Sequence, residues 1–118
     1  MTELQNVLTQ FNQAFANNDV AYLKEHVTDD IEWTIVGDQD IRGKAAFVEA
    51  LEAMAGAEPA KLNIEHVITH GKEASVNGTI SMNTDEGEQT FAFCDVYKLN
   101  GHKDPKVSAM TSYVLRVN

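Results

Sequence analysis

The spacing of apolar residues changes along the chain from a helical period in the first half to a strand period in the second. The helical half predicts three helices with buried faces, carried by Phe11 and Phe15, then Leu23, then Phe47 and Leu51. A short strand over 31–36 and a polar loop over 37–43 are expected between the second and third helices. Gly56 is expected to end the third helix because glycine is common just after a helix.

The second half predicts a run of strands. Apolar residues alternate with polar ones over 61–69, 73–83, 88–99 and 107–117, and the turns between the first three segments are short. Short turns favour antiparallel pairing. Residues 1–118 are therefore expected to form one α+β domain. We expect it to be conical, with three helices from the N-terminal half packed on the concave face of a curved antiparallel sheet.

An aspartate lies inside the most apolar of these segments. Alternation places Asp95 on one strand face with Phe91, Phe93, Tyr97 and Leu99. A carboxylate among aromatic rings loses its hydration, so it must find a partner, bind a proton or carry chemistry. The pattern predicts a raised pKa for Asp95 and a pocket that contains this acid.

Composition and charge narrow the classes of partner. Hydrophobic residues make up 43% of the chain, which is ordinary for a globular domain. The formal net charge is −9, and a surface of this charge repels phosphate groups. Nucleic acid and anionic membranes are therefore poor candidates. No apolar run approaches the roughly 20 residues of a membrane span, and the N-terminal segment does not resemble a signal peptide. With Cys94 as the only cysteine, a cytoplasmic location is expected, and Cys94 is expected to fill space in the core.

The last strand has apolar residues on both faces. Thr111, Tyr113 and Leu115 are expected on one face together with Val107, whereas Met110 lies on the other. A strand that is apolar on both faces is usually covered on both sides. A homodimer through the outer sheet face would supply the second cover. The alternative is a surface strand with some exposed apolar residues.

Several short stretches carry a family resemblance. They are Asn18-Asp19-Val20, Val27-Thr28-Asp29-Asp30-Ile31-Glu32-Trp33, Ile41-Arg42-Gly43-Lys44, Cys94-Asp95-Val96-Tyr97-Lys98-Leu99 and Ala109-Met110-Thr111-Ser112-Tyr113. In this order and spacing, the chain resembles the nuclear transport factor 2-like superfamily over nearly its whole length. That superfamily includes ketosteroid isomerases, SnoaL-like polyketide cyclases and limonene epoxide hydrolases. The resemblance implies the fold, but it is a poor guide to activity because the fold supports many functions.

The ketosteroid isomerase pattern can be transferred at one of three positions. Asp95 matches the protonated aspartate of that family's oxyanion hole. Phe11 stands where the family has a tyrosine, and Ile35 stands where it has its general base. Classical ketosteroid isomerase activity is therefore not expected, because proton transfer has no base. In a SnoaL-like cyclase Asp95 could serve as the acid–base group, whereas no aspartate–arginine–aspartate set of a limonene epoxide hydrolase can be placed.

His66 is the other polar residue predicted on an apolar strand face. Leu62, Ile64 and Ile68 share its parity, so His66 could form an acid–base dyad with Asp95 if their strands bring them together. The alternative is a hydrogen-bonded histidine in the core or at its rim. No compact group of metal ligands and no glycine-rich phosphate loop is evident, so neither a metal nor another cofactor is expected.

We therefore expect a cavity that binds a small hydrophobic molecule with one hydrogen-bonding oxygen. Its predicted lining is Phe11, Phe15, Trp33, Ile35, Phe47, Leu51, Phe93, Asp95 and Tyr97. One alternative is a cofactor-independent isomerase, cyclase or hydrolase that uses Asp95, with His66 as the only candidate base. The other is a cavity filled by Trp33 and Tyr97, which would leave a structural dimer.

Overall fold

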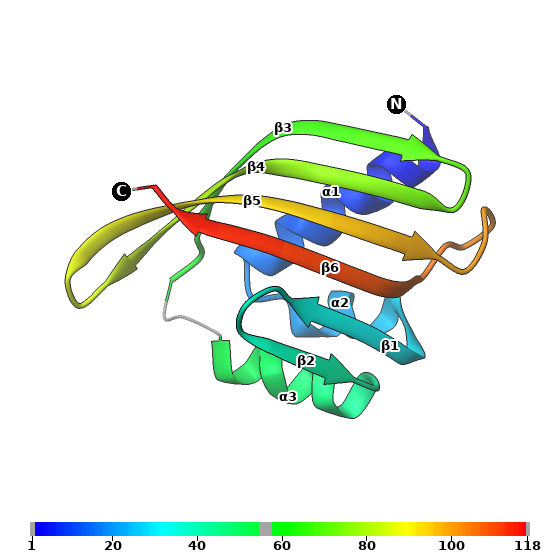
Figure 1. The fold of residues 1–118 in the computed structure, drawn as a ribbon, viewed down its shortest axis with the longest axis horizontal. Coiled ribbons are helices and arrows are strands. Elements are labelled where there is room, and N and C mark those ends of the chain that lie inside the picture. The colour runs from blue at the N-terminus through cyan, green and yellow to red at the C-terminus, as the bar shows by residue number, and fades with distance from the viewer. Residues whose placement is uncertain (1, 55–57, 118) are drawn as a thin grey trace.

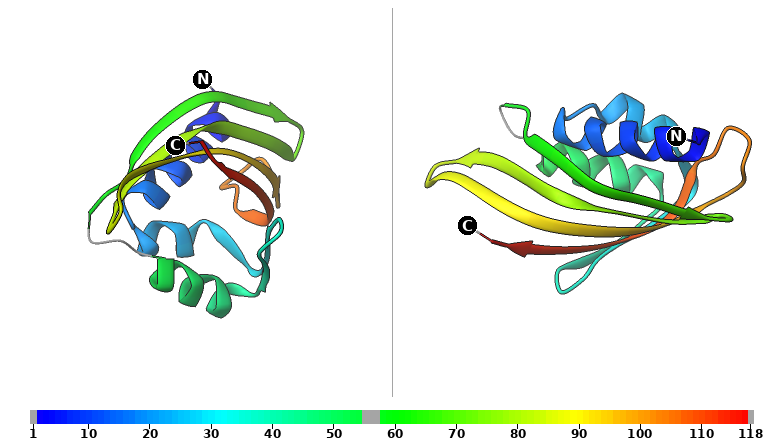
Figure 2. Two further views of the ribbon diagram at one scale, coloured as in Figure 1. Left: turned by 60° about the vertical axis from the view of Figure 1, so that its left-hand side comes forward. Right: turned by 90° about the horizontal axis from the view of Figure 1, so that it is seen from above.

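The computed structural model describes residues 2–54 and 58–117 and has an α+β architecture. A curved sheet carries the helices on one side (Figures 1 and 2). The elements are α1 (Glu3–Ala16), α2 (Val20–Glu25), β1 (Val27–Ile35), β2 (Gln39–Arg42), α3 (Lys44–Met54), β3 (Lys61–His70), β4 (Glu73–Thr84), β5 (Gly87–Leu99) and β6 (Val107–Arg116). This confirms the predicted conical α+β fold; the position of Gly56 lies outside the described residues.

The sheet has six strands in the order β2-β1-β6-β5-β4-β3. The consecutive strands β3, β4, β5 and β6 pair antiparallel with one another, and the short turns predict the first two of these three pairings. Strand β1 joins them parallel to β6, with Trp33 opposite Met110. The chain can make this parallel connection because helix α3 and strands β2 to β5 lie between the two strands in sequence.

The segment between α2 and α3 differs from the prediction. Strand β1 begins at Val27 rather than at residue 31, and the predicted polar loop contains strand β2. Strand β2 pairs antiparallel with β1 and buries only Ile41, which lies opposite Trp33. A short edge strand with a single buried residue has no apolar period, so its sequence resembles that of a loop.

Helix α1 packs across the concave face and closes the core. It begins with a capping box, in which the Gln5 backbone N–H donates to the Thr2 hydroxyl at 3.2 Å and the Gln5 side chain accepts from the Thr2 N–H at 3.0 Å. Its apolar stripe buries Leu8 and Phe11, and the Phe11 ring meets the Tyr97 ring edge-on at 6.0 Å. Of the described helices, none is long and apolar enough to cross a membrane.

The outer face of the sheet is not covered by the described helices (Figure 2). Tyr113 and Leu115 are 50% and 72% exposed on this face of β6. Val107, predicted on the same face, is buried instead. The pairing of β5 with β6 shifts between Lys98 and Leu99, because β6 has one extra residue there. This bulge turns the side chain of Val107 to the concave face instead of the outer one.

Candidate functional site

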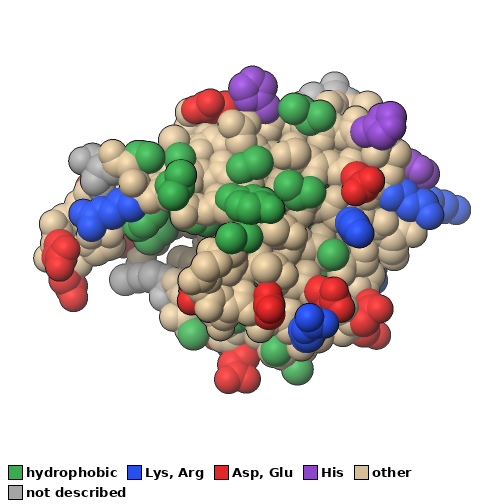
Figure 3. Space-filling view, viewed as in Figure 1, with side chains coloured by type: hydrophobic (Ala, Val, Ile, Leu, Met, Phe, Trp, Pro, Cys, Tyr) green, Lys and Arg blue, Asp and Glu red, His purple; other side chains and the backbone are tan. Residues whose placement is uncertain are grey.

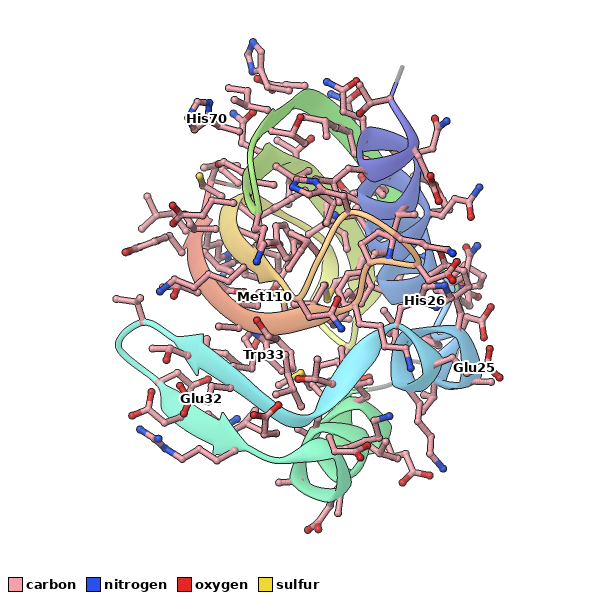
Figure 4. All side chains as sticks on the ribbon, turned by 90° about the vertical axis from the view of Figure 1, so that its right-hand side faces the viewer. Glu25, His26, Glu32, Trp33, His70 and Met110 are labelled. Carbon is pink, nitrogen blue, oxygen red and sulfur yellow. The ribbon has the colours of Figure 1, made fainter. Side chains whose placement is uncertain are left out.

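A cavity of about 500 Å³ lies against the concave face of the sheet. Strands β1, β4, β5 and β6 supply most of its wall, and α1 contributes Asn12 and Phe15. Figure 4 shows the labelled Trp33 and Met110 close together in the interior, where β1 and β6 pair. The cavity is lined by Asn12, Phe15, Trp33, Ile35, Asp38, Met54, Leu62, Ile80, Met82, Phe91, Phe93, Asp95, Met110, Ser112 and Val114. Most of this surface is apolar, and its polar groups are concentrated around Asp95.

Asp95 is held by two neighbouring hydroxyl groups. The Tyr97 hydroxyl, two residues along the same strand face, donates to Asp95 Oδ2 at 3.1 Å. The Ser112 hydroxyl, directly opposite on β6, also forms a hydrogen bond with the Asp95 carboxyl. Both donors favour the ionised form of the carboxyl.

Each of these hydroxyl groups is held in turn by a buried donor. The Trp33 indole N–H donates to Ser112 Oγ at 2.9 Å. The Asn12 side-chain amide donates to the Tyr97 hydroxyl at 3.1 Å and to the Leu8 carbonyl oxygen at 2.9 Å. Asn12 and Ser112 are the buried polar residues of the described core. The result is a connected network from α1 and β1 to one carboxyl group, which fixes its orientation.

Burial and the hydrogen-bond network together determine the pKa of Asp95. Burial raises the pKa of Asp95 to about 6, while the hydrogen bonds from Ser112 and Tyr97 act in the opposite direction. The predicted rise in pKa is confirmed. Burial, followed by the charge of Asp95, raises the pKa of Tyr97 well above its ordinary value, so its hydroxyl remains a donor. At neutral pH most Asp95 side chains are ionised, and mild acidification protonates them.

The structure separates the predicted lining residues into two groups. Phe15, Trp33, Ile35, Phe93 and Asp95 line the cavity. The others lie elsewhere: Leu51 lines an adjoining cavity, and Phe11, Phe47 and Tyr97 are fully buried in the core beneath. Trp33 and Tyr97 leave the cavity open, with the Phe15 and Phe47 rings meeting Trp33 edge-on at 5.5 and 5.6 Å.

His66 does not share the concave face with Asp95, contrary to the prediction. The register of β3 on β4 shifts between Ile64 and His66, so that His66 lies opposite Asn77. Val76, the residue before Asn77, lies opposite Asp95, so the two predicted partners are on opposite faces of the sheet. His66 is exposed and its Nδ1 lies 2.9 Å from Asn77 Oδ1. The dyad is therefore replaced by a histidine–asparagine pair on the outer face.

Sequence reasoning did not identify Asn12 and Ser112 as parts of the site. Asn12 falls within the apolar stripe of α1, one position from Phe11, and a buried amide there signals a polar partner. Ser112 lies two residues after Met110 on β6, so the alternation of the strand places both side chains on the same face as Asp95. Asp38, an exposed residue of the loop between β1 and β2, also lines the cavity.

The molecule has two other hollows, of which only the first adjoins this site. One of about 570 Å³ shares Phe15, Met54, Ile80 and Met82 with the Asp95 cavity. Another, of about 600 Å³, is a surface depression lined by Ala21, Lys24, Glu25, Lys44 and Lys106. Within residues 2–54 and 58–117, no three His, Cys, Asp or Glu side chains are grouped to hold a metal ion.

Comparisons with known proteins agree with this architecture. The family model described as a SnoaL-like domain matches residues 8–107. An NTF2-like protein of unknown function from Cytophaga hutchinsonii is 25% identical, with a TM-score of 0.76 over 94% of this chain and 98% of that one. A putative SnoaL-like polyketide cyclase from Shewanella putrefaciens is 17% identical, with a TM-score of 0.86 over 97% and 80% of the two chains.

An LEH-like epoxide hydrolase from M. tuberculosis has the same fold. It is 19% identical, with a TM-score of 0.79 over 93% of this chain and 80% of that chain. No curated protein matches the sequence. These likenesses confirm the predicted membership of the NTF2-like superfamily.

Proposed function

The chain belongs to the SnoaL-like domain family, and on that premise we propose that it binds a small, mostly apolar molecule in the Asp95 cavity. The observation that carries the proposal is one oriented carboxyl group in the wall of an apolar cavity of about 500 Å³. An apolar cavity with a few fixed polar groups is the usual form of a small-molecule site. The side chains supply contact area, and Asp95 orients the ligand.

A screen by thermal shift tests this proposal. Small apolar compounds with one polar group, among them steroid enones, terpenoids, cyclic ketones and alicyclic amines, should include some that raise the melting temperature of the protein. Asp95→Ala should abolish the shift, because it removes the polar contact. Ile35→Trp, which fills the cavity from its wall, should abolish it as well. Glu73→Gln, an exposed acid at the start of β4, is the matched control and should retain the shift. A screen without any shift, or a shift that persists in Ile35→Trp, would contradict the proposal.

A second candidate function is acid–base catalysis by Asp95 without a cofactor. The observation that favours it is the pKa of about 6, since a base is most effective when its pKa lies near the working pH. Relatives of this fold include a putative polyketide cyclase and an epoxide hydrolase, which is consistent with turnover in such a cavity. Asp95 would remove a proton from the substrate and return it, as in an isomerase or a cyclase.

Deuterium exchange tests for this proton transfer. A bound cyclic ketone in deuterated water should exchange its α-hydrogens faster with the protein than without it. The rate should rise with pH and level off above about pH 6, as Asp95 ionises. Asp95→Asn should lose the exchange and retain the fold. Exchange that is unchanged in Asp95→Asn would exclude Asp95 as the base.

We also propose that the protein forms a homodimer through the outer face of the sheet. Figure 3 shows hydrophobic side chains gathered near the middle of this face. Ile68, Val96, Tyr113 and Leu115 are large apolar residues on this face, and all four are at least 40% exposed. Such a patch is typical of a protein interface. Sedimentation at micromolar concentration should show a dimer, and Leu115→Glu should give a folded monomer; a wild-type monomer would contradict the proposal.

A further inference from the structure

We infer that the ligand of the Asp95 cavity carries a protonated amine, which donates hydrogen bonds to the Asp95 carboxylate. This inference rests on the proposed small-molecule site and specifies the polar group that the site recognises. It follows from the direction of the hydrogen bonds around Asp95 and from the charges that line the cavity.

The hydrogen-bond donors of the polar network are already bonded to other residues of the same network. The Trp33 N–H is used by Ser112, and the Tyr97 hydroxyl hydrogen is used by Asp95. The Ser112 hydroxyl has one hydrogen, which its bond to the ionised carboxyl uses.

The orientation of the Asn12 amide is fixed in the same way. The Leu8 carbonyl oxygen can only accept, so the amide nitrogen of Asn12 must face it. Its two hydrogens then go to Leu8 and Tyr97, and its carbonyl oxygen is what remains for another partner. Asn12 and Asp95 both line the cavity, so the groups that this network offers a ligand are acceptors. A site of acceptors is complementary to a donor.

The charges around the cavity favour a cationic donor over a neutral one. Asp38 and Asp95 are its two charged lining residues, and none of the described lining residues is Lys, Arg or His. The side chains that face Asp95 from neighbouring elements are Ser112 on β6, Val76 on β4 and Asn12 on α1, and none of the three carries a charge. Arg116 shares the strand face of Ser112 but lies four residues farther along β6, opposite Phe91. Four residues of a strand separate the backbone positions of Ser112 and Arg116 by about 13 Å.

A neutral oxygen acceptor makes the opposite demand on Asp95. A carbonyl oxygen can accept a hydrogen bond from Asp95 only where Asp95 is protonated. The amine requires the ionised carboxylate. The two ligand classes therefore predict opposite pH dependence around the pKa of Asp95, which is about 6.

Three probes with one hydrocarbon cage separate the ligand classes. They are adamantylmethylamine, which is cationic, adamantyl methyl ketone, which only accepts, and methyladamantane, which has neither property. Binding to the purified full chain is measured by calorimetry at about pH 5 and about pH 7. The amine is expected to bind the most tightly of the three at about pH 7. Its affinity should fall about tenfold at about pH 5, because ionised Asp95 becomes scarce.

Variants assign this effect to Asp95. Asp95→Asn keeps the shape and removes the charge, so amine affinity at about pH 7 should fall about tenfold or more and lose its pH dependence. Asp38→Asn, at the exposed mouth, should lower it by about twofold. Glu73→Gln should leave it unchanged.

The outcomes distinguish this inference from the proposed function. Tighter binding of the ketone, with affinity that rises toward about pH 5, would overturn the amine inference and leave the proposed site standing. Equal, pH-independent binding of the amine and methyladamantane would also overturn it, since contact area alone would explain both. Failure of all three probes, together with no hit in the thermal-shift screen, would remove the site itself and the inference with it.

Discussion

Strands β3 and β5 both pair with β4, and each carries one polar residue that the sequence predicts among apolar neighbours. The register of β5 on β4 runs unbroken from Gly87 to Lys98, so Asp95 lies on the concave face as alternation predicts. The register of β3 on β4 shifts before His66, so His66 lies on the outer face. Alternation therefore assigns a side chain to a face only as far as the register is unbroken.

A glycine in β4 lies where the register of β3 shifts. Gly78 pairs with Ile64 on one side and with Phe93 on the other. A Cβ at this position would overlap the carbonyl oxygen of Asn63, so β3 comes closer here than any side chain would permit. A glycine inside a strand is a known sign of a bulge or of a close backbone approach.

Gly78→Ala is expected to have the largest effect on this comparison. The added methyl group meets backbone atoms, which cannot move aside as a flexible side chain can. We expect a loss of about 3 kcal/mol in the free energy of unfolding, measured by urea denaturation. Backbone NMR should place the largest shifts in β3 rather than in β5.

Gly101→Ala is the matched control for this substitution. Its Cβ would meet nothing within 4 Å, and the free energy of unfolding should change by less than about 0.5 kcal/mol. Equal stability of the two variants would show that the close approach does not hold β3 in its register.

Substitutions at Asp95 test the face where alternation holds. The pKa of Asp95 is about 6 in the folded protein against an ordinary value of 3.8, so the folded state retains its proton at pH values where the unfolded chain loses it. Ionisation therefore destabilises the fold progressively as pH rises from about 4 to about 6, by up to roughly 3 kcal/mol. Asp95→Asn avoids this cost.

Asp95→Asn should accordingly raise the free energy of unfolding by about 1–3 kcal/mol at about pH 8 and change it little at about pH 4. Asp95→Leu should be about 2 kcal/mol less stable than Asp95→Asn at both pH values, because the buried Tyr97 hydroxyl loses its acceptor. Denaturation curves at the two pH values measure both differences. A stability difference between Asp95→Asn and wild type that does not depend on pH would contradict the raised pKa.

The sequence predicts most of the fold because its strongest patterns are local. The capping box of α1 and the alternation of β5 can each be recognised within a single segment, and the short turns predict the antiparallel run of β3 to β5. Strand β2 and the parallel pairing of β1 with β6 depend on contacts distant in sequence, which no local period records.

The candidate site shows the same division. Alternation identifies Asp95 and predicts its raised pKa, but the hydrogen-bond network around it also includes Ser112, Trp33 and Asn12 from three other elements. Phe11 was predicted to line the cavity, yet it packs beneath the cavity against Tyr97. Which aromatic ring faces a cavity and which fills the core behind it depends on depth along the cone, and strand or helix parity gives only the face.

His66→Ala is expected to have the smallest effect and tests the face where alternation fails. The side chain is exposed and its described hydrogen bond is to Asn77, so the free energy of unfolding should change by less than about 0.5 kcal/mol. The pKa of Asp95, followed by NMR of its side-chain carboxyl carbon, should stay at about 6 because the two residues lie on opposite faces. Ser112→Ala is the positive control: it removes a hydrogen bond that lowers this pKa, so the pKa should rise. A shift of the Asp95 pKa in His66→Ala as large as that in Ser112→Ala would restore the dyad and refute the outward placement of His66.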